Sequence, residues 1–71
     1  MIKLFWNDLT KEEQERAEIS YLSILEDVAA QGDEYDIADY ECKRDSHSLR
    51  LAALKYKTFI RDKDGYIFVN M

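Results

Sequence analysis

The chain has 71 residues, of which 46% are hydrophobic and 35% charged, a balance typical of one small globular domain. A domain of this length buries only about 60% of its unfolded surface, which excludes a large interior active site. The net charge is −5, and apolar runs such as Leu51 to Leu54 are far shorter than the roughly 20 residues of a membrane span. The start of the chain lacks a secretory signal and the single cysteine cannot form an internal disulfide. We therefore expect one domain over residues 1–71 in the cytoplasm.

The first predicted helix begins after Thr10. Its hydroxyl can accept from the N–H of Glu13 while the Glu13 carboxylate reaches back to the Thr10 N–H, which is a capping box. Glu12 and Arg16 are spaced as an i,i+4 ion pair. Gly32 is predicted to end the helix as its C-cap glycine. Between these ends, apolar residues at steps of three and four form a stripe that should face the core, namely Ala17, Tyr21, Leu22, Ile24, Leu25, Val28 and Ala29.

A second helix is predicted over residues 33–56, because this stretch contains neither proline nor glycine. We favour one continuous or slightly bent helix. The alternative is a fresh start capped by Ser46, since the residues around it are polar and helix formers are few before it. The very short connection at Gly32 predicts that the two helices pack antiparallel.

After Leu54 the apolar period changes to that of a β-hairpin. Residues 57–61 and 66–70 are predicted as strands, and Gly65 supplies the positive φ of the turn between them. The segment from Met1 to Trp6 is rich in β-forming residues and is a candidate third strand at the edge. The expected fold class is therefore α+β, with two antiparallel helices, a C-terminal hairpin and this candidate strand.

Acidic residues concentrate in one segment. Residues 1–45 carry thirteen acids and five bases (−8) and residues 46–71 carry two acids and five bases (+3), which together give the net charge of −5. Within residues 33–41, acids and tyrosines interleave with no base among them. This pattern is explained either by a solvated helix face or by a surface that docks on a basic partner protein. Phosphate repulsion disfavours direct nucleic acid binding. The candidate partner-binding residues are Asp33, Glu34, Tyr35, Asp36, Asp39, Tyr40 and Glu41.

The chain shows no catalytic motif, and we expect no enzyme activity and no cofactor. Cys42 and His47 are the only soft metal ligands. On a continuous helix five residues turn the chain through about 500°, so these two side chains lie roughly 140° apart and cannot share an ion. A break in the helix would remove that objection. We therefore predict no bound metal, with zinc at Cys42 and His47 as a remote alternative.

The residues from Phe5 to Ala17, with Tyr21 after them, resemble the start of small phage and prophage accessory proteins, and Asp64 to Ile67 resembles their terminal hairpin. The resemblance implies an inhibitor of host defence, a class that includes the anti-CRISPR proteins, in the cytoplasm of the host cell.

We therefore expect a protein that binds a host defence protein, such as a Cas9-type nuclease, through its acidic face. The alternative is a homodimeric phage structural or regulatory accessory protein that buries its hairpin and N-terminal aromatic residues against a second copy. The sequence leaves the choice between monomer and homodimer open.

Overall fold

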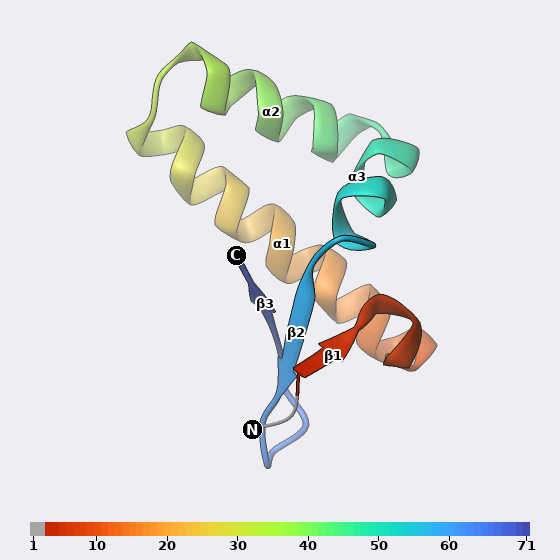
Figure 1. Cartoon of the computed structure of the whole chain (residues 1–71). Coiled ribbons are helices and arrows are strands. Elements are labelled where there is room, and N and C mark those ends of the chain that lie inside the picture. Colours follow the sequence, from red (N-terminus) through yellow and green to blue (C-terminus); the bar gives the residue numbers. More distant parts are fainter. Residues whose placement is uncertain (1–2) are drawn as a thin grey trace.

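A computed structural model describes residues 3–71 of the chain, and within them it contains three α-helices and a three-stranded antiparallel sheet (Figure 1). The α+β class is confirmed, although the arrangement differs in its number of helices. Met1 and Ile2, which the predicted third strand included, lie outside the described residues. The elements in chain order are β1 (Lys3–Phe5), the 3-10 turn η1 (Trp6–Asp8), α1 (Lys11–Gln31), α2 (Glu34–Asp45), α3 (His47–Leu54), β2 (Thr58–Arg61) and β3 (Ile67–Asn70).

The first helix, α1, begins with the predicted capping box. The N–H of Glu13 donates to the Thr10 hydroxyl at 3.2 Å, and the N–H of Thr10 donates to the Glu13 carboxylate at 2.9 Å. The buried part of the predicted stripe consists of Ala17, Tyr21 and Leu25. The far end of the stripe is not buried, since Val28 is 45% exposed.

Gly32 ends α1 as predicted, but not through a left-handed conformation. Its φ of −100° and ψ of −168° are extended, so the backbone alone would accept other residues. Glycine is needed because a Cβ at this position would collide with the side chain of Asp36. That side chain turns back toward the start of α2, so Gly32 ends one helix and leaves room for the cap of the next.

The predicted continuous second helix is wrong. Ser46 has an extended backbone (φ −118°, ψ 109°) and divides the segment into α2 and α3. Its hydroxyl accepts the N–H of Leu49 at 3.3 Å, which caps α3. Arg50 stabilises the break from the other side, because its Nη1 donates to the carbonyls of Lys43 and Arg44 at the end of α2. The alternative start at Ser46 is therefore the one that forms.

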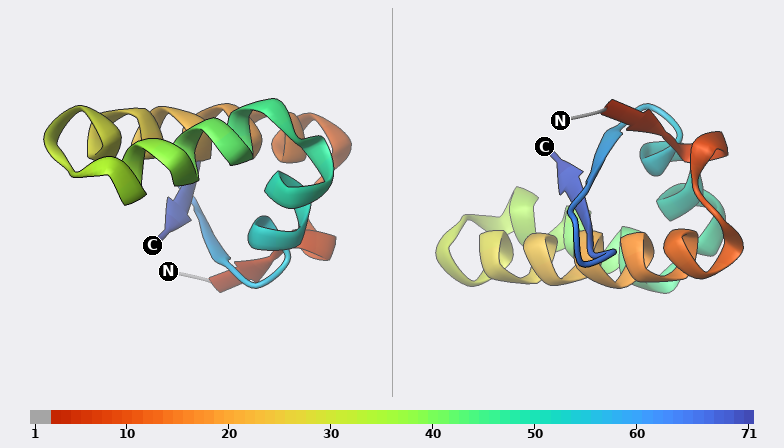
Figure 2. Two further views of the ribbon diagram at one scale, coloured as in Figure 1. Left: turned by 90° about the horizontal axis from the view of Figure 1, so that it is seen from above. Right: turned by 90° about the horizontal axis from the view of Figure 1, so that it is seen from below.

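The antiparallel packing of the first two helices is confirmed, since α1 and α2 lie side by side as one layer (Figure 2). Arg50 also connects the new helix to this layer. Its Nε donates to the Glu18 carboxylate of α1 at 3.0 Å, and both side chains are largely buried. The chain therefore turns sharply after α2, and α3 leads back to the sheet.

The sheet has the strand order β1-β2-β3, and the predicted third strand is confirmed over Lys3–Phe5. It pairs antiparallel with β2, which becomes the central strand. The hairpin between β2 and β3 has the predicted Gly65 at φ +86°. Asp62 stabilises its turn, because one carboxylate oxygen accepts the N–H groups of Asp64 and Tyr66, both at 2.8 Å.

The core lies between the inner face of the sheet and the helices. In the register of the strands, Leu4, Phe59 and Val69 form one row across this face. Phe59 is fully buried and its ring centroid lies 5.9 Å from that of Trp6. Leu54 of α3 is also fully buried. The N-terminal strand thus extends the sheet at its edge and does not cover a face.

The outer face of the sheet has no helix over it. Phe5 and Phe68 are 59% and 52% exposed there, and Lys3 is its one charged side chain among the three strands. Antiparallel sheets that face water on one side normally place polar side chains outward. This face therefore combines three apolar side chains, Phe5, Ile60 and Phe68, with the polar Lys3, Thr58 and Asn70.

A partly buried ion pair joins the start of α1 to the end of β2. Arg61 donates from Nε and Nη2 to the two carboxylate oxygens of Glu13 at 2.6 and 2.7 Å, a bidentate geometry. Hydrogen bonding from Arg61, with a further contribution from the Thr10 N–H, lowers the pKa of Glu13 from 4.5 to about 2. Folding therefore favours the ionised carboxylate.

This pKa predicts the pH dependence of stability. Because the pKa of Glu13 is lower in the folded chain, its stabilisation is fully present above about pH 4.5 and is lost as the pH falls toward 2. The variant Glu13→Gln keeps a side chain suited to the capping box but removes the charge. We expect it to melt below the wild type at pH 7, and the difference in melting temperature to shrink toward pH 2. Glu12→Gln, an exposed neighbour, is the matched control. A difference that does not change with pH contradicts the assignment.

Candidate functional site

The predicted binding residues belong to α2 and its N-cap, at the edge of the molecule. None of the twelve residues of α2 is buried, and the helix contacts α1 along one side only. The sequence explains why α2 lies at the edge of the molecule. Only a narrow side of this helix faces α1, and it carries Tyr40 and Lys43, which are both partly buried. The remaining faces of α2 are open to solvent.

Two of the predicted acids have a structural role. Asp33 is the N-cap of α2, and its Oδ1 accepts the N–H groups of Tyr35 at 3.0 Å and Asp36 at 3.3 Å. Asp36 returns the contact, since its Oδ2 accepts the N–H of Asp33 at 3.3 Å. This is a second capping box with aspartate at both ends. Their carboxylates are therefore engaged with backbone N–H groups.

Two further predicted residues are engaged within α2. Asp39 accepts a hydrogen bond from the ammonium group of Lys43 at 2.7 Å, an i,i+4 ion pair, and this hydrogen bond raises the pKa of Lys43. The guanidinium of Arg44 lies 5.4 Å from the centre of the Tyr40 ring, and Tyr40 packs against the core. Lys43 and Arg44, near the end of α2, therefore partly neutralise the negative charge in the middle of the helix.

Three of the seven predicted residues remain available to a partner. Glu34 and Glu41 have neither an ion pair nor a side-chain hydrogen bond within residues 3–71, and Tyr35 is 86% exposed. Ala38 lies between the two glutamates on the same side of the helix, because residues 34, 38 and 41 follow the helical repeat. We call this surface, formed by Glu34, Tyr35, Ala38 and Glu41, the outer face of α2.

The outer face of α2 continues into a hollow at the junction with α3. The hollow has a volume of about 380 Å³. Leu49 of α3 supplies an apolar side chain that is 50% exposed, and Ile37 beside the outer face is 43% exposed. Sequence reasoning missed Leu49, because the hollow exists only where the helix breaks. The residues that line it are Ala38, Glu41, Cys42, Asp45, Ser46 and Leu49.

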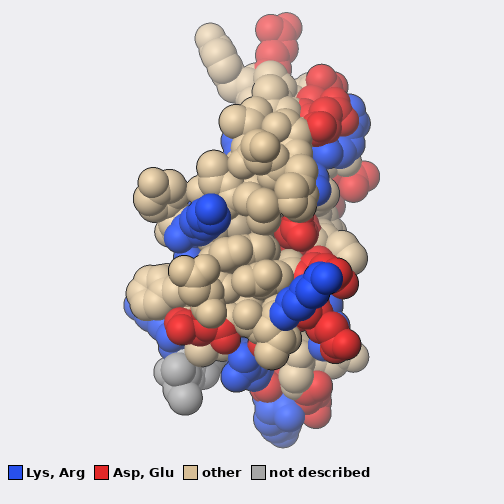
Figure 3. All heavy atoms as spheres, turned by 90° about the vertical axis from the view of Figure 1, so that its right-hand side faces the viewer, with Lys and Arg blue, Asp and Glu red and all other residues tan. Residues whose placement is uncertain are grey.

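Acidic and basic side chains both occur on the surface around α3. Figure 3 shows the side of the molecule that carries α3, where uncharged side chains occupy the centre and acidic and basic side chains lie around it. A second hollow of about 480 Å³ beside α3 contains Lys55 and Tyr56. The acidic outer face of α2 is therefore a local feature.

The break at Ser46 removes the angular objection to a site at Cys42 and His47, but the two residues take different surroundings. Cys42 is exposed and lines the hollow at the α2–α3 junction. The His47 Nδ1 lies 3.1 Å from Nη2 of Arg50 and 3.4 Å from the Glu18 carboxylate. Among residues 3–71, no three His, Cys, Asp or Glu side chains are grouped as metal ligands require. The expectation of no metal stays a prediction.

The comparisons with known proteins give no further guide. Comparison with protein-family models, with curated proteins and with solved structures found no match. No helix in the described part of the chain has the length and the apolar character to cross a membrane. The outer face of α2 and the sequence are therefore the features that point to a function.

Elemental analysis tests the metal prediction. We expect the purified protein to contain no stoichiometric zinc, because His47 faces Glu18 and Arg50 and Cys42 faces the α2–α3 hollow. A chelator should leave the melting temperature unchanged. If zinc were bound, its removal would lower the melting temperature, because bound metal stabilises so small a domain. One zinc per chain that disappears in the variant Cys42→Ser would show that the prediction is wrong.

Proposed function

We propose that this chain is a non-enzymatic protein-binding module whose outer face of α2 docks on a basic surface of its partner. The observation that carries the proposal is the exposure of Tyr35 beside two glutamates that have no partner within the described residues. Tyrosine supplies a large contact area and loses little conformational entropy on binding. Glu34 and Glu41 supply charge for attraction over a longer range.

The hollow beside the outer face of α2 supports binding of a protein rather than of a simple ion. Ala38, Leu49 and Ile37 add apolar surface next to the acids, and protein interfaces combine such an apolar centre with a polar rim. Carboxylates alone would attract cations but would bury little surface. The combination fits a partner with basic side chains around an apolar residue.

We propose that the partner is a protein that handles nucleic acid, and that binding inhibits it. A basic surface built for phosphates also attracts a cluster of carboxylates, so an acidic protein competes with the nucleic acid for it. The resemblance to phage accessory proteins supports a host defence protein as the target. A Cas9-type nuclease is the first candidate to test.

A triple variant tests the outer face of α2. We expect Glu34→Gln, Glu41→Gln and Tyr35→Ala together to weaken binding to the nuclease at least about tenfold and to flatten its salt dependence, because both the charges and the ring are lost. The melting temperature should change little, since none of these side chains has a partner within the described residues. Binding and protection from cleavage are measured at several salt concentrations.

The control for this test removes two equal charges elsewhere. Glu12→Gln and Glu26→Gln, both exposed on α1, match the change in net charge without touching the outer face of α2. They should leave the affinity near that of the wild type. Equal weakening in both variants would assign the effect to net charge, and direct binding of the purified protein to nucleic acid would contradict the whole proposal.

The second candidate function is a homodimeric accessory protein, and the open outer face of the sheet favours it. Phe5 and Phe68 are exposed there on opposite edge strands. If this face pairs with a second copy, sedimentation should show a dimer at high concentration that Phe5→Ser weakens. Tyr35→Ala on α2 is the control. A strict monomer at every concentration removes this candidate.

A further inference from the structure

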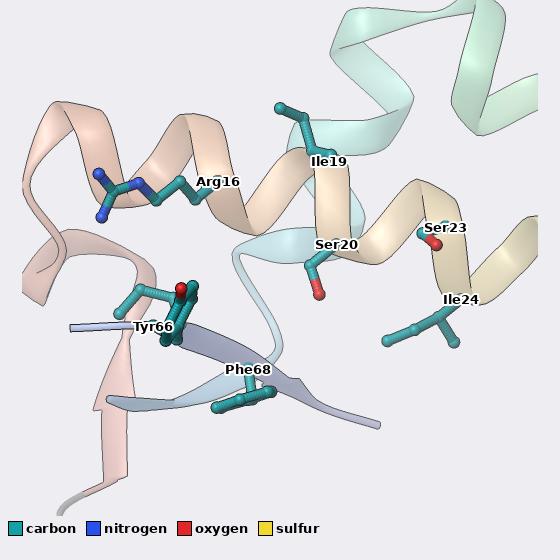
Figure 4. A pocket seen from close by; sticks show the side chains of 8 residues that line it. Arg16, Ile19, Ser20, Ser23, Ile24, Tyr66 and Phe68 are labelled. Atoms are coloured by element: carbon teal, nitrogen blue, oxygen red, sulfur yellow. The ribbon is translucent and has the colours of Figure 1, made fainter. Parts of the chain in front are cut away.

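A third hollow, of about 560 Å³, lies where α1 passes β3, away from α2 (Figure 4). Its lining comes from α1, from β3 and from Tyr66, which directly precedes β3, so it is a groove with open ends. In the close view, Ser20 and Ile24 point from α1 toward the strand, whereas the side chain of Ile19 points away from it. We call it the α1–β3 groove. Its lining residues are Arg16, Ile19, Ser20, Ser23, Ile24, Tyr66, Ile67 and Phe68.

The α1–β3 groove is apolar although it is open to solvent. Tyr66 and Phe68, on the strand side of the groove, are 64% and 52% exposed, and Ile24 points toward this side from α1. Single exposed apolar residues are common on protein surfaces, but a contiguous group beside a hollow marks a contact surface.

Arg16 is the one charged residue of the groove lining. The predicted pair of Glu12 and Arg16 does not form, and Arg16 has no ion pair within residues 3–71. Its side chain lies along the α1 wall above Tyr66 (Figure 4). An occupant of the groove therefore meets apolar walls along most of its length and a free guanidinium at one end. A carboxylate is the group that a guanidinium binds in bidentate geometry.

We propose that the α1–β3 groove binds a short peptide segment of a partner protein in which two or three apolar side chains lie next to an aspartate or glutamate. The apolar side chains contact Ile24 and Phe68, and the carboxylate pairs with Arg16. The hydroxyls of Ser20 and Ser23 offer hydrogen bonds to the peptide backbone. The open ends favour a segment of a longer chain over a small molecule, whose surface a binding pocket would largely enclose.

A second copy of the chain fits this groove less well. A twofold interface brings the same surface of both copies together. The groove lining contains Arg16 and no carboxylate, so self-pairing would place two guanidinium groups in one interface without a counter-charge. The inference is independent of the outer face of α2, which lies on other elements and has the opposite charge.

Selection from a displayed library of random peptides against the full chain tests the proposal. We expect enriched peptides to share an acid within a few positions of apolar residues. Arg16→Gln should weaken a selected peptide at least about tenfold, because the charged hydrogen bonds are lost. Phe68→Ser should also weaken it. The controls are Lys55→Gln, which removes an exposed charge outside the groove, and Tyr56→Ser, which removes an exposed aromatic ring outside it.

Nuclear magnetic resonance of the isotope-labelled protein locates the bound peptide. The backbone amide signals of Ser20, Ser23 and Ile67 should shift on addition of the selected peptide and should not shift in Phe68→Ser. Melting curves of the variants check that each is folded. The proposal is overturned if no peptide is enriched, if the enriched peptides lack acids, or if Arg16→Gln binds them as the wild type does. A concentration-dependent dimer that Ser20→Arg in the groove abolishes and Phe5→Ser on the outer face of the sheet does not would assign the groove to a second copy.

Discussion

The arrangement of the three helices depends on the guanidinium of Arg50. It binds the carboxylate of Glu18 on α1 and the carbonyls of Lys43 and Arg44 at the end of α2, while its own backbone belongs to α3. One side chain thus satisfies the C-terminal carbonyls of one helix and attaches the next helix to the first. In a chain this short the apolar core is small, so polar contacts of this kind determine where the helices lie.

This constraint explains why the outer face of α2 is free. The end of α2 is held by Arg50 and its start by the capping box of Asp33 and Asp36, so the helix needs little apolar contact along its length. A helix held at its ends can present most of its surface to a partner. The sharp turn at Ser46 then brings Leu49 beside Glu41, which creates the hollow. The contacts at the two ends of α2 therefore both stabilise the helix and leave its outer face exposed.

The features that could be predicted from the sequence are those with local causes. The Thr10 capping box, the turn at Gly65 and the β-forming start of the chain each depend on neighbouring residues. The sequence offered the helix break at Ser46 only as the alternative, because much of its support comes from Glu18, which lies 32 residues before Arg50. The site was predicted only in part, since the run of acids does not distinguish a cap from a free carboxylate. The spacing of Asp33 and Asp36 is a local signal that could have made that distinction.

The two proposed surfaces have opposite chemistry and share one rigid support. α1 is a single helix of 21 residues, roughly 30 Å long, with α2 packed along it and the α1–β3 groove on another part of its surface. The outer face of α2 offers carboxylates, whereas the groove offers apolar walls and one guanidinium. A ligand suited to one surface is therefore poorly suited to the other. Because no residue belongs to both surfaces, their binding free energies should add, as expected for sites without shared contacts. A partner that engages the whole molecule can use both.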